Sequence, residues 1–235
     1  LPAIVSFLPM KAPAQKSGET TFLEKLGEVV IARRRPVLFF SSAMALALIA
    51  LVPRLETNDN FVHYFDKGLE FRDNADFAND NLTGVYTLEY SLSSGEPGGI
   101  AEPEYMAHLQ AFANWFEQQE HITHVAPVTD IITRLNKNMH GDDDAWYRLP
   151  DDRDLAAQYW LLYEMSLPYG LDLNNQINVD KSATRMTVLM RDVSTKETKV
   201  VLAAAEKWQR ENLPEHMFSP ASSTTVMFTF LADKN

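Results

Sequence analysis

Residues 36–53 read PVLFFSSAMALALIALVP, a stretch without a charged residue that directly follows the arginines at positions 33–35. In a helix, these residues at a rise of ~1.5 Å each span about 27 Å, close to the ~30 Å hydrocarbon core of a bilayer. Ser41 and Ser42 can each donate a hydrogen bond to a carbonyl one turn earlier, so both are compatible with lipid. The stretch predicts a membrane-spanning helix, around which the rest of the chain is organised.

The three arginines predict the orientation of this helix, because short loops rich in Lys and Arg stay in the cytoplasm. Everything after Pro53 is then expected outside the cytoplasm. A buried core helix of a soluble protein is one alternative, but a charge-free run of this length is long for that. A cleaved signal peptide is another, but it would begin near a chain start, and no small-x-small cleavage site closes the run before Pro53.

Charge is divided unevenly along the chain. Residues 1–35 carry six Lys or Arg against three acidic residues, a net charge of +3, whereas residues 54–235 carry fifteen against twenty-nine, a net charge of −14. A basic front and an acidic back agree with a cytoplasmic segment followed by a translocated domain. Because an acidic domain repels phosphate backbones, no nucleic-acid partner is expected. The absence of cysteine excludes disulfides, thiolate metal sites and cysteine nucleophiles.

The sequence predicts three parts. Residues 1–35 open with LPAIVSFLP at positions 1–9, which looks like the last turns of an earlier membrane helix and indicates an excerpt from a longer protein. After a polar loop, Thr21 is expected to cap a basic, amphipathic linker helix on the cytoplasmic face of the bilayer. Residues 36–53 form the membrane helix, and residues 54–235 form a periplasmic domain.

The domain at residues 54–235 carries alternating strand and helix patterns. Side chains of alternating polarity predict four strands, at residues 86–92, 122–128, 186–190 and 226–230. Apolar stripes at helical spacing predict helices at residues 69–82, 102–119, 130–139, 154–167 and 195–212, the last capped by Thr195. Apart from a helical insertion at about 129–180, the order is βαββαβ. This order predicts an α+β fold, a ferredoxin-like sandwich with two helices on one face of a four-stranded sheet.

Six segments together carry a resemblance to a known family. They are LPAIVSFLP at 1–9, RRRP at 33–36, NDNFVHYFD at 58–66, NLTGVYTLEYSLSSGE at 81–96, LNKNMHGDD at 135–143 and LPYGLDLNNQINVDKSATR at 167–185. With the membrane helix, the chain resembles the middle of an exporter of the resistance-nodulation-division (RND) superfamily, in the branch related to the large mycobacterial-type (MMPL) and hopanoid transporters. The resemblance covers essentially all residues and is specific as a block rather than in any one motif.

The resemblance implies a bacterial inner-membrane protein of twelve helices in two similar halves. Residues 1–9 would end the sixth helix, residues 11–35 would connect the halves, residues 36–53 would be the seventh helix, and residues 54–235 would be the second periplasmic loop, a porter-type domain. It also implies transport driven by protons through acidic residues in other membrane helices, so no coupling residue is assigned here. The implied partners are the lipid bilayer, a hydrophobic or lipid-like substrate, the other half of the transporter and possible further subunits, with no cofactor.

Aromatic residues give the best candidate for a substrate site. A cleft for an apolar or amphipathic molecule could be lined by Phe112, Trp115, Phe116, Trp146, Tyr147, Tyr159, Trp160 and Tyr163. The alternative is that the insertion packs these rings against the sandwich or against the matching domain of the other half. Packing is favoured, because aromatic residues at helical spacing mostly belong to cores.

Metal binding and catalysis are weaker interpretations. His121 lies three residues before His124, and His140 precedes a run of acidic residues at 142–144, but a strand start and a solvated loop explain both. The sequence contains no Gly-x-Ser-x-Gly motif and no Gly-rich phosphate loop, so neither an enzyme nor a metal protein is predicted. A singly anchored periplasmic interaction module or enzyme stays open as the alternative, and further apolar spans in the gene would discriminate against it.

Overall fold

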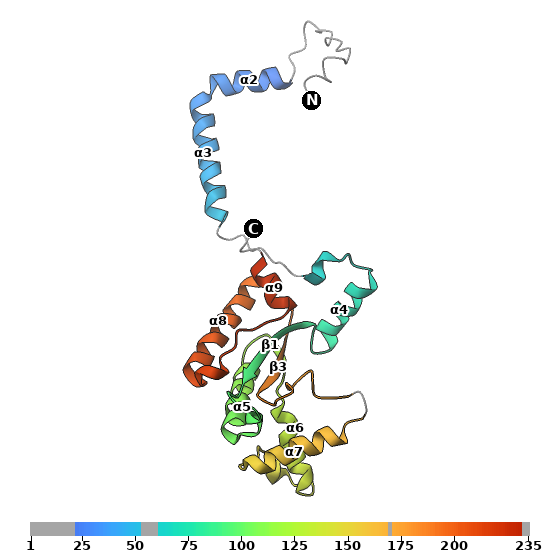
Figure 1. Ribbon diagram of the computed structural model, residues 1–235. Helices are drawn as coiled ribbons and strands as arrows, with labels where there is room; N and C mark the ends of the chain where they lie inside the picture. The colour runs from blue at the N-terminus through green and yellow to red at the C-terminus, as the bar shows by residue number, and fades with distance from the viewer. Residues whose placement is uncertain (1–21, 53–60, 169–170, 232–235) are drawn as a thin grey trace, which may run out of the picture. The chain divides into compact units, whose positions relative to one another are not determined.

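The computed structural model describes residues 22–52, 61–168 and 171–231 (Figure 1). The chain divides into two compact units, Leu1–Leu55 and Glu56–Asn235, each of which is described by itself. The predictions for residues 1–9, for the loop that follows and for the Thr21 cap lie outside the described residues. The predicted helix end at Pro53 lies outside them as well.

In its described part, the first unit consists of helices α2 (Phe22–Ala32) and α3 (Arg34–Leu51). Arg33 joins them with a backbone outside the helical region, at φ −112° and ψ 33°. Helix α3 confirms the predicted apolar helix but begins two residues earlier, so that two of the three arginines lie in its first turn. The Ser41 hydroxyl donates to the Leu38 carbonyl at 3.1 Å, which satisfies this polar group within the helix, as lipid requires.

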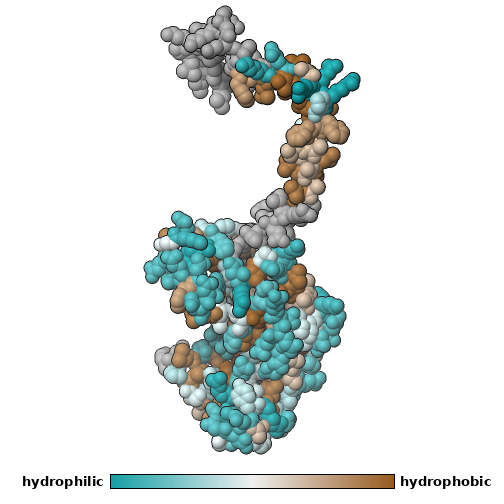
Figure 2. Space-filling view, turned by 180° about the vertical axis from the view of Figure 1, so that it is seen from behind, coloured by the Kyte–Doolittle hydropathy of each residue, from teal (hydrophilic) through white to brown (hydrophobic). Residues whose placement is uncertain are grey.

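Almost all side chains of α3 are exposed. None of its residues is buried, and Figure 2 shows hydrophobic side chains along its whole length. Its large apolar side chains are 48% to 80% exposed: Leu38, Phe39, Phe40, Met44, Leu46, Leu48, Ile49 and Leu51. Burying one such side chain stabilises a fold by ~1.5–3 kcal/mol. With all of them exposed to water, stabilisation on the order of 10 kcal/mol would be lost. Within the described residues, α3 is the one helix long and apolar enough to cross a membrane.

The second unit is built on a three-stranded sheet. Strands β1 (Tyr86–Ser93), β2 (Ile122–Ala126) and β3 (Ala183–Met190) lie where the alternation predicts them, in the order β1-β3-β2. Both neighbouring pairs are antiparallel, so β1 and β2 run parallel to each other with β3 between them. The described residues thus have the predicted α+β class, a mixture of helices and a small antiparallel sheet.

Two helices cover one face of this sheet. The even-numbered side chains of β1 and β3 are buried, and they lie under α5 (Pro103–Glu117) and α8 (Thr195–Asn212). Phe112 of α5 contacts both Tyr90 of β1 and Trp208 of α8, which places the three elements around one core. The Tyr105 hydroxyl ties α5 to the sheet, because it donates to the Leu92 carbonyl at 2.9 Å.

The N-terminus of α8 corrects one prediction. The capping residue is Ser194 rather than Thr195. Its hydroxyl accepts a hydrogen bond from the backbone N–H of Glu197, whose carboxylate in turn accepts from the backbone N–H of Ser194 at 2.8 Å. This reciprocal capping box satisfies two N–H groups that an uncapped helix would leave without partners.

The other face of the sheet is polar. Its odd-numbered side chains are half-buried or exposed, and Glu89 of β1 forms an ion pair with Arg185 of β3. Like a typical antiparallel sheet, this one packs its core on a single side, which is the reason that the alternation was readable from the sequence.

The predicted fourth strand at residues 226–230 is wrong, because this segment forms helix α9 (Thr224–Leu231). Thr225 and Thr229 lie one turn apart on its inner side, and the buried Thr229 hydroxyl donates to the Thr225 carbonyl at 2.7 Å. What remains of strand pairing beside β1 is one antiparallel bridge between Glu89 and Ser222, directly before the helix. An apolar run this short is compatible with the period of a strand and with that of a helix, and here tertiary packing favours the helix.

The predicted helical insertion at about 129–180 is present. It contains α6 (Thr129–Met139), the 3-10 turn η4 (Asp144–Trp146) and α7 (Arg153–Ser166). Helix α6 contacts η4, α7 and also α5, and α7 contacts the turn η3 (Gly99–Ala101). The Asp152 carboxylate caps α7 by accepting from the Leu155 N–H at 2.8 Å. The 3-10 turns η2 (Phe61–Tyr64) and η5 (Glu215–Met217) and helix α4 (Glu70–Asn81) complete the unit.

Candidate functional site

Three of the predicted site residues lie in the core between α5 and α8. Phe112 and Phe116 have no exposed surface, and Trp115 is half-buried beside them. The ring of Trp208 stacks on Phe112 at 5.2 Å and on Trp115 at 5.8 Å. Tyr90 approaches from the sheet at 5.2 Å from Phe112, and burial raises the pKa of its hydroxyl. These rings fill the space between sheet and helices, as the packing interpretation expects.

Two further residues, Tyr159 and Trp160 of α7, are buried within the insertion. The Tyr159 hydroxyl donates to the Asn136 side-chain carbonyl at 3.1 Å, and the Asn136 amide donates to the Arg148 carbonyl at 2.9 Å. This chain of hydrogen bonds joins α7, α6 and the loop after η4. The indole N–H of Trp160 has no hydrogen-bond partner among the described residues. Both rings hold the insertion together.

The last three predicted residues retain exposed surface but lie apart. Trp146 stacks on His140 with ring centroids 3.7 Å apart, and the Arg148 guanidinium lies 5.2 Å from the same indole. Tyr147 is 54% exposed. Tyr163 is half-buried and faces α6 across a pocket of about 290 Å³. The eight aromatic residues therefore form separate groups rather than one cleft, and substrate binding by them stays a prediction.

The pocket beside Tyr163 is the best remaining place for an amphipathic molecule. Its other walls come from one side of α6, where Ile131 and Leu135 are apolar and Asp130 and Arg134 are charged. Burial raises the pKa of Asp130, and the nearby Glu117 carboxylate acts in the same direction. An apolar wall with one carboxylate and one guanidinium at its edge suits a ligand with an apolar body and a polar end.

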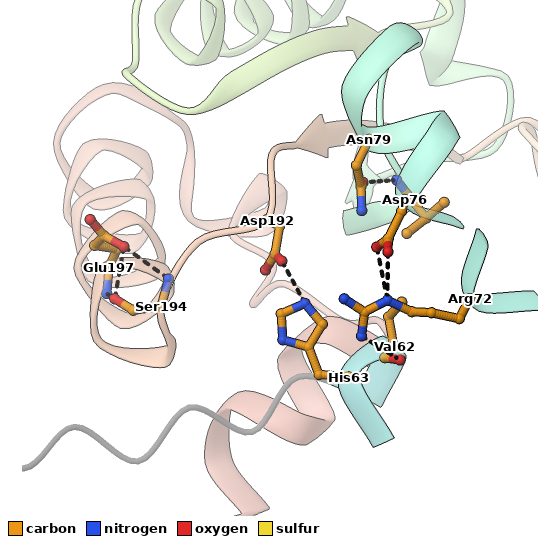
Figure 3. Close-up of polar contacts among 9 residues, drawn as sticks. Val62, His63, Arg72, Asp76, Asn79, Asp192, Ser194 and Glu197 are labelled. Carbon is orange, nitrogen blue, oxygen red and sulfur yellow. Dashed lines mark hydrogen bonds and ion pairs between the residues drawn. The ribbon is translucent and has the colours of Figure 1, made fainter. Parts of the chain in front are cut away.

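A second site was missed by the sequence analysis and lies where η2 and α4 meet the rest of the domain (Figure 3). The buried Arg72 side chain holds both carboxylate oxygens of Asp76, at 2.9 and 2.8 Å, and donates to the Val62 carbonyl at 3.3 Å. His63 of η2 reaches Asp192, which follows β3, at 3.1 Å. These contacts fasten the segment that precedes the sheet to the end of its central strand.

Aromatic contacts reinforce this junction. Phe61 stacks on Phe228 of α9 at 5.7 Å and meets the edge of Tyr86 of β1 at 5.8 Å, and Tyr64 meets Phe228 at 6.0 Å. A small cavity of about 30 Å³ remains beneath them, beside Arg191. The sequence signal was the segment NDNFVHYFD at 58–66, whose aromatic residues show no helical or strand period because η2 is a single 3-10 turn.

The histidines discussed for metal binding lie in separate surroundings. His121 adopts a left-handed backbone at φ 74° before β2, whereas His140 is held by its stack on Trp146 and by the Asn136 carbonyl at 2.7 Å. Among the described residues, no three His, Asp or Glu side chains lie close enough together to hold a metal ion.

Comparison with known proteins does not assign this chain to a family or a function. No protein-family profile matches the chain, and no curated protein is significantly similar to it. The function is therefore argued from the chain's own residues.

Proposed function

We propose that this chain is part of an inner-membrane exporter of the RND type, whose α+β domain lies in the periplasm and passes a hydrophobic or lipid-like substrate. The observation that carries the proposal is α3, a helix of membrane length that begins at arginines and leaves its apolar side chains uncovered. Such a helix is stable in hydrocarbon and costly in water. In this proposal an ion gradient, coupled elsewhere in the protein, drives transport.

The arrangement of the sheet supports a ferredoxin-like, porter-type domain. Strands β1 and β2 are parallel, are joined through α5 and have β3 between them, which is the split βαβ arrangement. Helices α5 and α8 then lie together on one face. The place of a fourth strand is beside β1, where Ser222 makes its bridge to Glu89. In this proposal the domain has three strands of the sandwich, and the bridge at Ser222, directly before α9, lies at the edge where other such sandwiches have a fourth.

The pocket between α6 and α7 supports the substrate class. It offers an apolar wall and the half-buried ring of Tyr163, next to the charged side chains of Arg134 and Asp130. The acidic domain would repel polyanions, whereas a molecule with an apolar body meets no such barrier. To export such a molecule, the pocket has to open and close in turn. In this proposal, α6 and α7 move relative to each other.

Cysteine labelling tests the membrane topology, because the natural chain has no cysteine and each introduced thiol reports on its own position. Val179→Cys marks a 91% exposed site in the domain, and Lys25→Cys marks an exposed site on α2. In intact cells whose outer membrane is permeable, a thiol reagent that cannot cross the inner membrane should label Val179→Cys only. Lys25→Cys should react once the inner membrane is opened. Equal labelling of both sites in intact cells would contradict a spanning helix.

Transport itself needs a second experiment on the complete reading frame that contains this chain. Cells that express it should retain less of an apolar fluorescent dye than cells without it, and Tyr163→Ala should reduce the difference. The matched control is Tyr147→Ala, which removes an exposed tyrosine outside the pocket. If dye retention is unchanged by expression while the topology test succeeds, the singly anchored alternative gains the support.

A further inference from the structure

Exposed apolar side chains gather where η2, the start of α4 and α9 meet. The group comprises Tyr64, Phe65, Phe71, Met227, Phe230 and Leu231, which we call the η2–α9 patch. Tyr64 reaches α9, where it meets the half-buried Phe228 at 6.0 Å, and Phe65 meets Phe71 at 4.8 Å between η2 and α4. Clusters of exposed large apolar side chains generally mark an interaction surface.

The patch is held on a rigid support. Within α4, the Nε–H of Arg72 is shared between both carboxylate oxygens of Asp76, and the bond from Arg72 Nη1 to the Val62 carbonyl fixes η2 against α4. The pair between His63 and Asp192 fixes η2 to the end of β3 (Figure 3). The exposed rings of Tyr64 and Phe65 are therefore held in position by the contacts of η2 with α4 and β3.

The two sides of α9 differ in character. On the inner side, the buried Thr229 bonds within the helix, and the Thr225 hydroxyl accepts from the Thr87 N–H of β1 at 3.2 Å. The outer side presents Met227, Phe230 and Leu231, and the Lys199 ammonium lies 5.6 Å from the Phe230 ring. Apolar side chains with a lysine at their edge are the composition found at the boundary of a membrane, where the amine reaches water and the rings reach lipid.

The chain itself limits how far this patch can lie from a bilayer. Nine residue steps separate Val52, after the end of α3, from Phe61, the first residue of η2. At ~3.5 Å per residue, a fully extended chain covers only about 30 Å. A protein partner or a second copy has no comparable tether on this chain, so the bilayer is the occupant that is always within reach.

We propose that the η2–α9 patch lies in the headgroup region of the bilayer that α3 spans, on the non-cytoplasmic side, with Met227 and Phe230 directed into it. This rests on the proposed function, because it requires α3 to be a membrane helix. The attraction is apolar rather than electrostatic, since Glu70 and Asp73 of α4 stand beside the patch and would be repelled by anionic lipid. Zwitterionic lipid is thus the matching surface.

Fluorescence in lipid nanodiscs tests this contact on the full chain. Met227→Cys is labelled with an environment-sensitive dye in phosphatidylcholine discs that hold one copy of the protein. Some of the lipids carry a nitroxide at the headgroup. The control is Leu161→Cys on α7, where the exposed fraction is 54% against 58% for Met227 and which lies at the opposite end of the domain (Figure 1).

The expected result is a blue-shifted emission at position 227 and quenching there that exceeds the quenching at position 161 by about a factor of two or more. Equal quenching at the two positions overturns the proposal. A blue shift at position 227 without nitroxide quenching also overturns it, because protein rather than lipid then covers the patch.

A third label separates this failure from failure of the proposed function. Leu46→Cys lies near the middle of α3 and should be quenched by a nitroxide deep in the acyl chain. If position 46 is quenched and position 227 behaves like position 161, only the patch proposal fails. If position 46 is not quenched, α3 is not in the bilayer and the exporter proposal fails with it.

Discussion

Replacing Phe112 by alanine separates a packed aromatic core from an open cleft. The Phe112 ring has no exposed surface and lies within 6.1 Å of four other rings, those of Tyr90, Trp115, Phe116 and Trp208. Truncation of a buried phenylalanine costs ~3–5 kcal/mol of folding free energy. Because each aromatic pair adds ~0.5–1.5 kcal/mol beyond its buried area, we expect a loss in the upper part of that range.

Urea unfolding of the detergent-solubilised chain, followed by tryptophan fluorescence, measures the loss. With a slope of ~1–3 kcal/mol per molar urea, the midpoint should fall by roughly 1–5 M at an unchanged slope. Tyr147→Ala is the control, since removal of a 54% exposed ring should change the unfolding free energy by no more than about 0.5 kcal/mol. A loss below about 1 kcal/mol for Phe112→Ala would refute the packing argument and favour the substrate cleft.

Three further substitutions test local features. Arg72→Lys should lower the melting temperature, because a single ammonium nitrogen cannot replace both the Nε that bonds Asp76 and the Nη1 that donates to the Val62 carbonyl. The hydrogen bonds from Ser194 hold the pKa of Glu197 below its ordinary value. Glu197→Gln should therefore lower the free energy of unfolding at pH values above that ordinary pKa. In urea titrations, this difference from the natural chain should vanish as the pH falls through the lowered pKa. Gly84→Ala should cost ~1–3 kcal/mol in the same assay, because φ is +90° and a Cβ would lie 2.9 Å from a backbone carbonyl.

Two of these substitutions have a matched control within the chain. Lys207→Arg alters an exposed helix pair and should leave the melting temperature unchanged. Gly68→Ala introduces a Cβ at φ +97° with no atom within 4 Å, so it isolates the backbone strain from the clash at Gly84. A pH-independent effect of Glu197→Gln would show that the carboxylate charge plays no part in the capping box.

The sequence predicted the sheet and its covering helices because burial on one face leaves a period that can be counted. Tyr86, Leu88 and Tyr90 alternate with polar residues since only one side of β1 meets the core. The same reasoning failed at residues 226–230, where Phe228 packs on Phe61 from a segment far away in the chain. A short apolar run is compatible with the helical and with the strand period, so a tertiary contact of this kind decides which structure it forms.

Less of the candidate site than of the fold could be predicted from the sequence. Helical spacing identified Phe112 and Phe116 as one stripe but could not show what covers them, because Trp208 comes from a helix beginning at Thr195. The junction at Arg72 was missed for a related reason. Its contacts join a single 3-10 turn to the end of β3, and neither carries a periodic signal.

The position of β3 at the centre of the sheet has a consequence for how the domain is made. Its pairs with β1 join residues 90 to 104 positions apart, from Ser93 with Ala183 to Tyr86 with Met190. Strands β1 and β2 meet only through β3, so no part of the sheet can form until β3, which begins at Ala183, has been synthesised. Pairings this distant make folding slow. Until then the apolar face of β1 has no strand to pair with, and the unfinished chain is prone to aggregation.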